Sequence, residues 1–322
     1  MSTMRAARFS TYGPPAALSV ETVPRPDLQA GDALVEIAAS AINPSDVKFV
    51  SGVFSPTLPR TPGRDFAGTV VAGSGRWRGK SVWGNGAGFG INRDGSHAQF
   101  VALPEDWLSE MPTNLSMDEA AAVGVPFVTA WTALVTAGEI RAGETVLITG
   151  ASGAVGRAAT QIAHWQKARV IGADIVERPD SGADVFINTK SKDLPTMVAA
   201  LTGNLGVTLV LDAVGGPVFE PAMKSMGLDG RHVVITSVGS RRVEFDLMDF
   251  YHNRQRLIGV DTAKLTGMEI ASILDRLRPG FESGALQPPS VNVWPLDDVV
   301  TAYEAVAAGE AAAKHVLQPN SR

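Results

Sequence analysis

A run of glycine and other small residues near the middle of the chain has the composition of a phosphate-binding turn. It reads Gly150-Ala151-Ser152-Gly153-Ala154-Val155-Gly156 and directly follows the apolar stretch Thr145 to Thr149. A pyrophosphate needs backbone N–H groups that point at it and no side chain in the way, and a glycine turn that leads into a helix N-terminus supplies both. We therefore expect a dinucleotide to bind at Gly150, Ser152, Gly153, Ala154, Val155 and Gly156. The alternative is a tight turn that holds no ligand.

A carboxylate stands where such a turn needs an acidic partner. The strand predicted from Arg169 to Ala173 is followed by Asp174, roughly 20 residues beyond the glycines, where an acidic side chain bonds the adenosine ribose hydroxyls and repels a 2′-phosphate. This position favours NADH over NADPH as the cofactor. Two other interpretations stay open: Asp174 is also typical of a solvated turn, and the nearby Arg178 is able to accept a 2′-phosphate.

The segments around these residues alternate between short apolar strands and helices. Such alternation predicts a parallel sheet that is covered by helices on both faces. We expect strands at 145–149, 169–173, 185–188, 209–212, 232–236 and 257–260, and helices at 154–165, 193–201 and 219–226. The tail is expected to add a helix at 296–307 and a strand at 315–317.

Residues 1–110 have a different sequence pattern, in which short runs typical of β-strands are separated by Gly and Pro. The glycine-rich segment from Gly84 to Gly90 lacks a strand-to-helix context, so we interpret it as a flexible surface loop. A helix that starts at the capping box Ser116-Met117-Asp118-Glu119 is expected to be interrupted by Gly124 and Pro126.

The composition of the 322 residues narrows the class of protein. Hydrophobic residues make up 45% and charged residues 19%, which predicts folded domains, and the length suits two of them. The formal net charge of -5 gives no electrostatic reason to expect nucleic acid or an anionic membrane as partner. The absence of cysteine excludes disulfides, thiol nucleophiles and cysteine-bearing zinc sites. Because the start is unlike a signal peptide and no long apolar run occurs, we expect a cytoplasmic protein.

Several motifs, taken together, resemble one family. They are Ile42-Asn43-Pro44-Ser45-Asp46, Pro62-Gly63-Arg64-Asp65-Phe66-Ala67-Gly68, the run from Ala121 to Ala130, the glycine turn, Leu211-Asp212-Ala213-Val214-Gly215-Gly216 and Ala313-Lys314-His315-Val316-Leu317. In this order they are similar to the zinc-independent medium-chain dehydrogenases/reductases of the quinone oxidoreductase (zeta-crystallin-like) kind. The resemblance implies an α/β protein and a homodimer. Its domains would be a GroES-like β-rich catalytic domain at 1–120 and 264–322, and a Rossmann domain with a doubly wound parallel sheet at 121–263.

The resemblance also implies roles for single residues. Zinc-dependent relatives have a cysteine in place of Asn43 and a histidine in place of Arg64, so no zinc is expected. In zinc-free relatives the residues that match Asn43 and Thr129 sit near the nicotinamide, and the lysine that matches Lys314 lies by the cofactor. Asp46 would orient Asn43, relay a proton or only cap a turn. The other residues implied to line the cofactor are Val214 at the adenosine and, along the nicotinamide half, Ser237, Val238, Asp261 and Thr262.

Two places depart from the family pattern. Most relatives have a helix after the second strand, whereas the segment from Ile175 to Asp184 is short and contains Pro179 and Gly182, which argues against one. We expect a more open adenine pocket on that side. His97 stands where relatives tend to have tyrosine, and without a metal partner we favour a core or cleft-wall residue over a catalytic acid.

Together these features predict hydride transfer from NAD(P)H to a small-molecule quinone or activated alkene. The protein would need only to hold the reactants together and to stabilise the charge that builds on the acceptor's oxygen, while solvent supplies the last proton. Two alternatives remain open. One is an enoyl- or acrylyl-CoA reductase, favoured by the run Ile258 to Thr262, and the other is a dinucleotide-binding protein without catalysis.

Overall fold

Six parallel strands form one sheet of the protein. Their spatial order is β10 (Val185–Asn188), β9 (Arg169–Asp174), β8 (Thr145–Thr149), β11 (Val207–Asp212), β12 (Met226–Val234) and β13 (Arg256–Gly259). Numbered along the chain, this order is that of a doubly wound dinucleotide-binding fold, in which ligands bind beyond the carboxyl ends of the strands where the order reverses. Here the order reverses between β8 and β11. The expected Rossmann-type sheet is confirmed.

A computed structural model describes residues 2–178, 181–309 and 313–321. The chain divides into two compact units, of which the first is Met1–Val128 with Ala263–Arg322 and the second is Thr129–Thr262. The parallel sheet belongs to the second unit, and both ends of the chain belong to the first.

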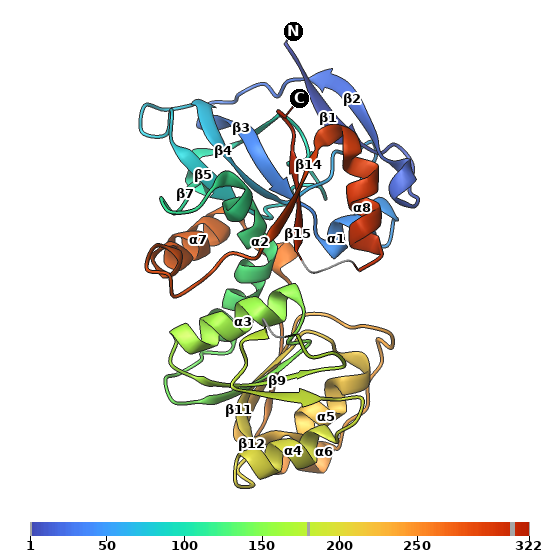
Figure 1. Ribbon diagram of the computed structural model, residues 1–322, viewed down its shortest axis with the longest axis vertical. Coiled ribbons are helices and arrows are strands. Elements are labelled where there is room, and N and C mark those ends of the chain that lie inside the picture. The colour runs from blue at the N-terminus through green and yellow to red at the C-terminus, as the bar shows by residue number, and fades with distance from the viewer. Residues whose placement is uncertain (1, 179–180, 310–312, 322) are drawn as a thin grey trace. The chain divides into compact units, whose positions relative to one another are not determined.

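The strands of the second unit are apolar throughout because both faces of the sheet are covered. Val146, Leu147 and Ile148 of β8 are completely buried. Figure 1 shows α3 (Ala154–Trp165) against one face and α4 (Leu194–Leu201), α5 (Phe219–Lys224) and α6 (Leu247–His252) against the other. A strand enclosed in this way has no polar side, so its sequence reads as a continuous apolar run rather than an alternation.

The connection from β9 to β10 crosses the sheet without a helix. No described residue of 175–184 is α-helical, as predicted, although Pro179 lies outside the described residues. Asp184 fixes the end of this segment, because its carboxylate accepts from the Val170 N–H at 2.7 Å and from His164 of α3 at 3.1 Å. Ala183 packs on β9 so closely that a Cβ on Gly172 would lie 2.9 Å from its methyl group. Ala183 and Asp184, at the end of this segment, therefore pack against β9.

Antiparallel pairing dominates the first unit. Its larger sheet has the order β14 (Val291–Pro295), β15 (Lys314–Gln318), β3 (Asp32–Ala41), β4 (Asp65–Ala72), β5 (Ser81–Gly84) and β7 (Ser109–Glu110), and β6 (Phe100–Pro104) also pairs with β3. A separate ribbon is formed by β1 (Thr3–Arg8) and β2 (Ser19–Pro24). Val316 and Leu317 of β15 pair antiparallel with the end of β3, which leads into α1 (Pro44–Val50). This pairing joins the C-terminal strand to the N-terminal half, as in the expected GroES-like domain.

Helix α2 (Met117–Trp131) runs without a break through Gly124 and Pro126, and a π-helical segment, Thr132–Ala137, continues it. The predicted interruption is wrong, because packing overrides the local preference of proline: most of this helix is buried. By length and composition Met117–Ala137 is apolar enough to cross a membrane, but its burial is that of a core helix.

Two further features differ from the expectations. Residues Gly84, Asn85 and Gly86 are buried rather than part of a surface loop, because the Asn85 amide binds a buried carboxylate, that of Asp65. Helix α7 (Gly267–Glu282) has no counterpart among the predicted helices, and the helix that follows it is α8 (Val299–Ala307). The sequence did carry a signal for α7, since Thr266 and Glu269 form a capping box at its start.

Candidate functional site

The glycine turn has the backbone shape that a phosphate site needs. Gly150 has φ of +65°, a conformation that side chains other than glycine's rarely adopt. A Cβ on Gly156 would lie 2.2 Å from the Gly150 carbonyl oxygen, so this glycine lets α3 pack against the turn. A Cβ on Gly153 would meet only that same oxygen, at 3.2 Å. The glycines thus divide into two that shape the turn and one, Gly153, that leaves space in front of it.

Helix α3 presents free backbone donors at this turn. Its first intrahelical hydrogen bond runs from Arg157 N to Gly153 O at 3.0 Å, and no side chain caps its N-terminus. The N–H groups of Ala154, Val155 and Gly156 precede that bond, so they are the groups that a helix leaves for an anion. A dinucleotide pyrophosphate fits this arrangement.

Asp174 ends β9 beside the turn, where the sequence places it. Its Oδ2 accepts from Ser152 N at 3.0 Å and its Oδ1 accepts from Ile175 N at 2.7 Å. The Ser152 hydroxyl donates to the Val176 carbonyl at 2.5 Å. The Ser152 N–H is therefore directed at the carboxylate, and Asp174 is held in one orientation with lone pairs still available on both oxygens.

A second carboxylate, Asp212 at the end of β11, organises the neighbouring loop. It accepts from the Thr149 hydroxyl at 2.5 Å, from Gly215 N at 2.8 Å and from Val214 N at 3.1 Å, and buried His232 contacts its other oxygen at 3.2 Å. Burial raises the pKa of Asp212, but these hydrogen bonds outweigh it, and the pKa lies below its ordinary value. Asp212 thus joins the two strands at the point where the sheet order reverses.

The remaining predicted cofactor residues of the second unit lie on loops that follow its strands. Val214 lies near the glycine turn, 3.1 Å from a Cβ built on Gly150, and its carbonyl accepts from Val238 N at 2.8 Å. Ser237 donates its hydroxyl to the Ser240 carbonyl at 2.7 Å. Beyond β13, the hydroxyls of Thr129 and Thr262 lie 3.3 Å apart, and the exposed Asp261 precedes Thr262.

Five charged or amide side chains meet in the first unit, and we refer to Asn43, Asp46, Arg64, Asp65 and Lys314 as the polar cluster. Lys314 Nζ donates to Asn43 Oδ1 at 2.5 Å. Asn43 Nδ2 donates to Asp65 Oδ2 at 2.9 Å and to Asp46 Oδ2 at 3.2 Å. Arg64 pairs with Asp46 at 3.4 Å. The structure therefore brings together Asn43, Asp46 and Lys314, which stand far apart in the sequence.

Asp46 carries out two of its expected roles at once. It accepts from the Asn43 backbone N–H at 2.7 Å, which caps the start of α1, and from the Asn43 side chain, which it orients. Its side chain is 1% exposed, so the Arg64 guanidinium compensates a buried charge.

Asp65, like Arg64, is a member of the polar cluster that the sequence prediction did not name as a site residue. It is completely buried, and besides Asn43 its donors are the Val125 backbone N–H, at 3.0 Å, and the Asn85 amide. A Cβ on Gly124 would lie 2.2 Å from its carboxylate, which explains a glycine inside helix α2. Only the folded chain shows this convergence, because the donors come from three separate segments.

Burial sets the charges of the polar cluster. It raises the pKa of Asp65, against which Lys314, the Asn43 hydrogen bond and Arg64 act. It lowers the pKa of Lys314, which Asp65 and Asp46 oppose. Each of the two charges therefore opposes the effect that burial has on the pKa of the other.

His97 belongs to the core of the first unit. It is completely buried, its Nδ1 lies 3.0 Å from the hydroxyl of the equally buried Tyr303, and its Nε2 lies 3.3 Å from the Ala41 carbonyl oxygen. Burial lowers the pKa of His97, which favours the neutral ring. These contacts support the interpretation of His97 as a core residue.

The residues at the two positions that bind zinc in relatives do not fit a zinc ion. Arg64 places a buried cation there, and the Asn43 oxygen already accepts from a second cation, Lys314. Among the described residues there is also no group of three or more His, Asp or Glu side chains that would hold a metal. A guanidinium has no lone pair to offer a metal, and the Asn43 oxygen is already occupied by the Lys314 ammonium.

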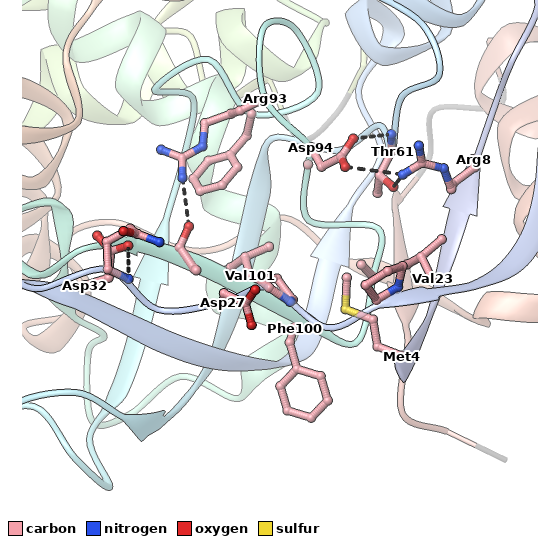
Figure 2. Close-up of a pocket in the computed structure, with 17 residues that line it drawn as sticks. Met4, Arg8, Val23, Asp27, Asp32, Thr61, Arg93, Asp94, Phe100 and Val101 are labelled. Carbon is pink, nitrogen blue, oxygen red and sulfur yellow. Dashed lines mark hydrogen bonds and ion pairs between the residues drawn. The ribbon is translucent and has the colours of Figure 1, made fainter. Parts of the chain in front are cut away.

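A separate cavity of about 600 Å³ lies in the first unit, where β1, β2 and β6 contribute walls (Figure 2). Three of its charged side chains are paired within the protein: Arg8 and the Thr61 N–H donate to Asp94 at 3.2 and 2.9 Å, and Arg93 donates to the Ala102 carbonyl at 2.8 Å. No side chain of the polar cluster lines it. We therefore do not assign this cavity to the site.

Comparison with known proteins places the chain in a family. Residues 29–113 match the family described as alcohol dehydrogenase GroES-like domain, and residues 154–277 match the family described as zinc-binding dehydrogenase. A zinc-type alcohol dehydrogenase-like protein of Schizosaccharomyces pombe is 35% identical over 288 residues, which are 87% of this chain and 86% of that protein.

Two other proteins are similar over almost their whole length. The quinone oxidoreductase of Rattus norvegicus is 30% identical over 312 residues, 94% of this chain and 93% of its own. The crystal structure of AibC has a TM-score of 0.90 and 28% identity, and covers 99% of this chain and 97% of its own. These matches confirm the resemblance drawn from the motifs. The chain belongs to the quinone oxidoreductase branch of the medium-chain dehydrogenase/reductase family, whose members are NAD(P)-dependent oxidoreductases.

Proposed function

We propose that the protein reduces a small quinone or an activated alkene with NAD(P)H, without zinc. The observation that carries the proposal is the polar cluster. Asn43 and Arg64 occupy the positions of two zinc ligands in zinc-dependent relatives, and Lys314 and the buried carboxylates lie beside them. A bound nicotinamide supplies a hydride. The protein then needs to hold the acceptor, exclude water and stabilise the oxygen on which charge builds.

We assign the cofactor to the second unit. The free N–H groups of Ala154, Val155 and Gly156 would bind the pyrophosphate, with Gly150, Ser152 and Gly153 shaping the turn. Val214 would lie against the adenosine, and Ser237, Val238, Asp261 and Thr262 along the nicotinamide half. Thr129, Asn43 and Asp46 would serve the reacting end, with Lys314 beside the cofactor. We propose NADH as the preferred cofactor, because Asp174 is held with acceptor lone pairs free.

We also propose that the two chain ends, 1–120 and 264–322, act as the catalytic domain and 121–263 as the dinucleotide-binding domain. The two compact units differ from these bounds mainly within helix α2. A cytoplasmic homodimer that acts on a small molecule, with no nucleic acid or membrane as partner, completes the proposal.

A substrate panel tests the function. Purified protein is mixed with quinones, enones, enals and enoyl-CoA thioesters, each with NADH and with NADPH, and oxidation of the cofactor is followed. Asn43→Leu, which removes the amide at the centre of the polar cluster, is the matched control for non-enzymatic oxidation. We expect turnover of a quinone or enone that this variant largely loses.

The same panel decides between the alternatives. Preference for enoyl-CoA thioesters over free enones would replace the proposal with an acyl-CoA reductase. Tight binding of NADH without oxidation by any acceptor would indicate a dinucleotide-binding protein without catalysis.

A further inference from the structure

The Asn43 side chain has used all its hydrogen-bond donors inside the protein. Its two N–H bonds point to Asp65 and Asp46, and its oxygen accepts from Lys314. Charge fixes this orientation, because the amide nitrogen must face the carboxylates and the oxygen must face the ammonium. An oxygen that becomes negative needs donors, so the Asn43 amide is not free to stabilise it.

Lys314, unlike Asn43, still has hydrogen-bond donors available. An ammonium has three N–H bonds, and within the described ranges the only hydrogen bond from Lys314 Nζ goes to Asn43. Lys314 is partly exposed, whereas Asp46 and Asp65 are buried. Lys314 Nζ therefore has two further N–H bonds to donate, and it lies close to the buried carboxylates Asp46 and Asp65.

We infer that Lys314 Nζ donates a hydrogen bond to the oxygen of the substrate, and that Asp65 is a positioning residue that holds Lys314 in place through Asn43. The inference rests on the proposed function. When a hydride forms a new C–H bond at the far carbon of an enone, the electron pair of the C=C bond moves toward the carbonyl oxygen. Lys314 would stabilise that charge, and a solvent proton added to the other carbon would complete the product.

The charges around Lys314 favour binding of a neutral carbonyl oxygen over binding of a permanent anion such as phosphate. The groups that face Lys314 are Asp46 on α1, Arg64 and Asp65 at the start of β4, and the neutral, buried His97. Two carboxylates balance the two cations of the polar cluster, so a phosphate would enter a site without net positive charge. An oxygen that is neutral when the substrate binds needs the donor only as the reaction proceeds.

The first test replaces the donor. In Lys314→Met we expect kcat/KM for an enone to fall about 100-fold, mainly through kcat, as when one oxyanion donor is removed. Lys314→Arg, which keeps a charged donor, should recover part of the loss. Because Lys314 also lies beside the proposed cofactor, the Kd of NADH is measured by fluorescence titration, and we expect it to rise far less than kcat/KM falls. A loss of NADH affinity as large as the loss in kcat/KM would assign Lys314 to the cofactor and overturn the inference.

The second test addresses Asp65 without turnover. Modification of Lys314 by an amine-specific reagent is followed by mass spectrometry across a pH series, because only the neutral amine reacts. Asp65 raises the pKa of Lys314, so Asp65→Asn should lower that pKa and let labelling begin at lower pH. The alkaline fall of kcat/KM, where the ammonium is lost, should move in the same direction.

Asn85→Ser is the matched control for a merely structural role. It removes the donor to the other carboxylate oxygen of Asp65 but keeps the charge. We expect this variant to lose stability in urea unfolding without a shift in the labelling curve. An unshifted curve in Asp65→Asn, or an equal shift in both variants, would contradict the role of Asp65.

The experiments distinguish failure of the proposed function from failure of the inference about Lys314 and Asp65. If no acceptor in the panel is reduced, the proposed function fails, and the labelling curves still show whether Asp65 controls Lys314. If turnover occurs but Lys314→Met keeps the wild-type kcat/KM, the function stands and the inference about Lys314 fails.

Discussion

At the scale of single residues, three aspartates define the site by accepting hydrogen bonds from distant segments. Asp174 ends β9 and Asp212 ends β11, the two strands that flank β8, and each fixes the loop beside it. Asp65 receives donors from Asn43, Asn85 and Val125. Each carboxylate is ordered before a ligand arrives, and such order reduces the entropy lost on binding.

The cofactor preference depends on Asp174. Its carboxylate can accept ribose hydroxyls, whereas the 2′-phosphate of NADPH would bring a like charge beside it. We expect kcat/KM to favour NADH by about tenfold, which corresponds to about 1.4 kcal/mol. Asp174→Ser should shift the preference toward NADPH.

Asp174→Asn serves as the control for the loop, because it removes the charge and keeps an oxygen for the Ser152 N–H. If charge decides the preference, both variants shift it. A wild-type protein that prefers NADPH tenfold or more would mean that Arg178 dominates the pocket instead.

The metal content follows from Arg64 and Lys314. Because Arg64 has no lone pair to offer a metal and the Asn43 oxygen already accepts from Lys314, elemental analysis of the purified protein should find no stoichiometric zinc. Chelators should leave the turnover of NADH unchanged. A tightly held zinc would contradict the assignment of the cluster.

Residue-level prediction from the sequence was uneven for physical reasons. The glycine turn and Asp174 were recognisable because backbone conformation and strand-end position leave a local pattern. Asn43, Asp46 and Lys314 were named only through the family resemblance. Asp65 was not predicted as a site residue, because its three donors are far apart in the sequence and only the folded chain brings them together.

At the scale of elements, helix α3 and the turn before it form the proposed phosphate site, in which each glycine has a different structural role. Gly156 allows the helix to approach the turn, and Gly153 leaves the approach to the N–H groups open. The parallel strands were predictable because complete burial makes them apolar. Helix α7 was not among the predictions, although its capping box is visible, and α2 continues through Pro126 because the core holds it.

The two glycines should respond differently to the same substitution. Gly153→Val places a side chain where the pyrophosphate would lie, while the backbone there is extended and accepts valine. We expect loss of NADH binding with little change in the free energy of unfolding. Gly156→Val, which collides with the turn, should cost about 1–3 kcal/mol of stability.

Binding is measured by titration and stability by urea unfolding of each variant. Unchanged NADH affinity in Gly153→Val would mean that the turn holds no ligand. Wild-type stability in Gly156→Val would contradict the close contact between α3 and the turn.

At the scale of the whole molecule, the proposed homodimer would need a surface for pairing, and the edge strand β13 offers one. Its Leu257 is 44% exposed, and the apolar residues Leu247, Met248 and Tyr251 of the preceding helix are exposed as well. An uncovered strand edge of this kind invites pairing with another strand. The sequence anticipated this strand, but the exposure of α6 emerged only from the structure.

We expect light scattering at micromolar concentration to give twice the chain mass of 33.8 kDa. Leu257→Lys should shift the protein toward the monomer, because charged residues on an edge oppose strand pairing. A wild-type mass equal to one chain would rule out the homodimer.

The most direct test of the account follows the hydride itself. The protein is mixed with NADH that carries deuterium on either face of the nicotinamide, together with the best enone from the panel, and the product is analysed by mass spectrometry. We expect deuterium from one face alone to appear on a carbon of the product, and Gly153→Val to abolish the transfer. A product without deuterium from either face, formed at the wild-type rate, would contradict hydride transfer by this protein.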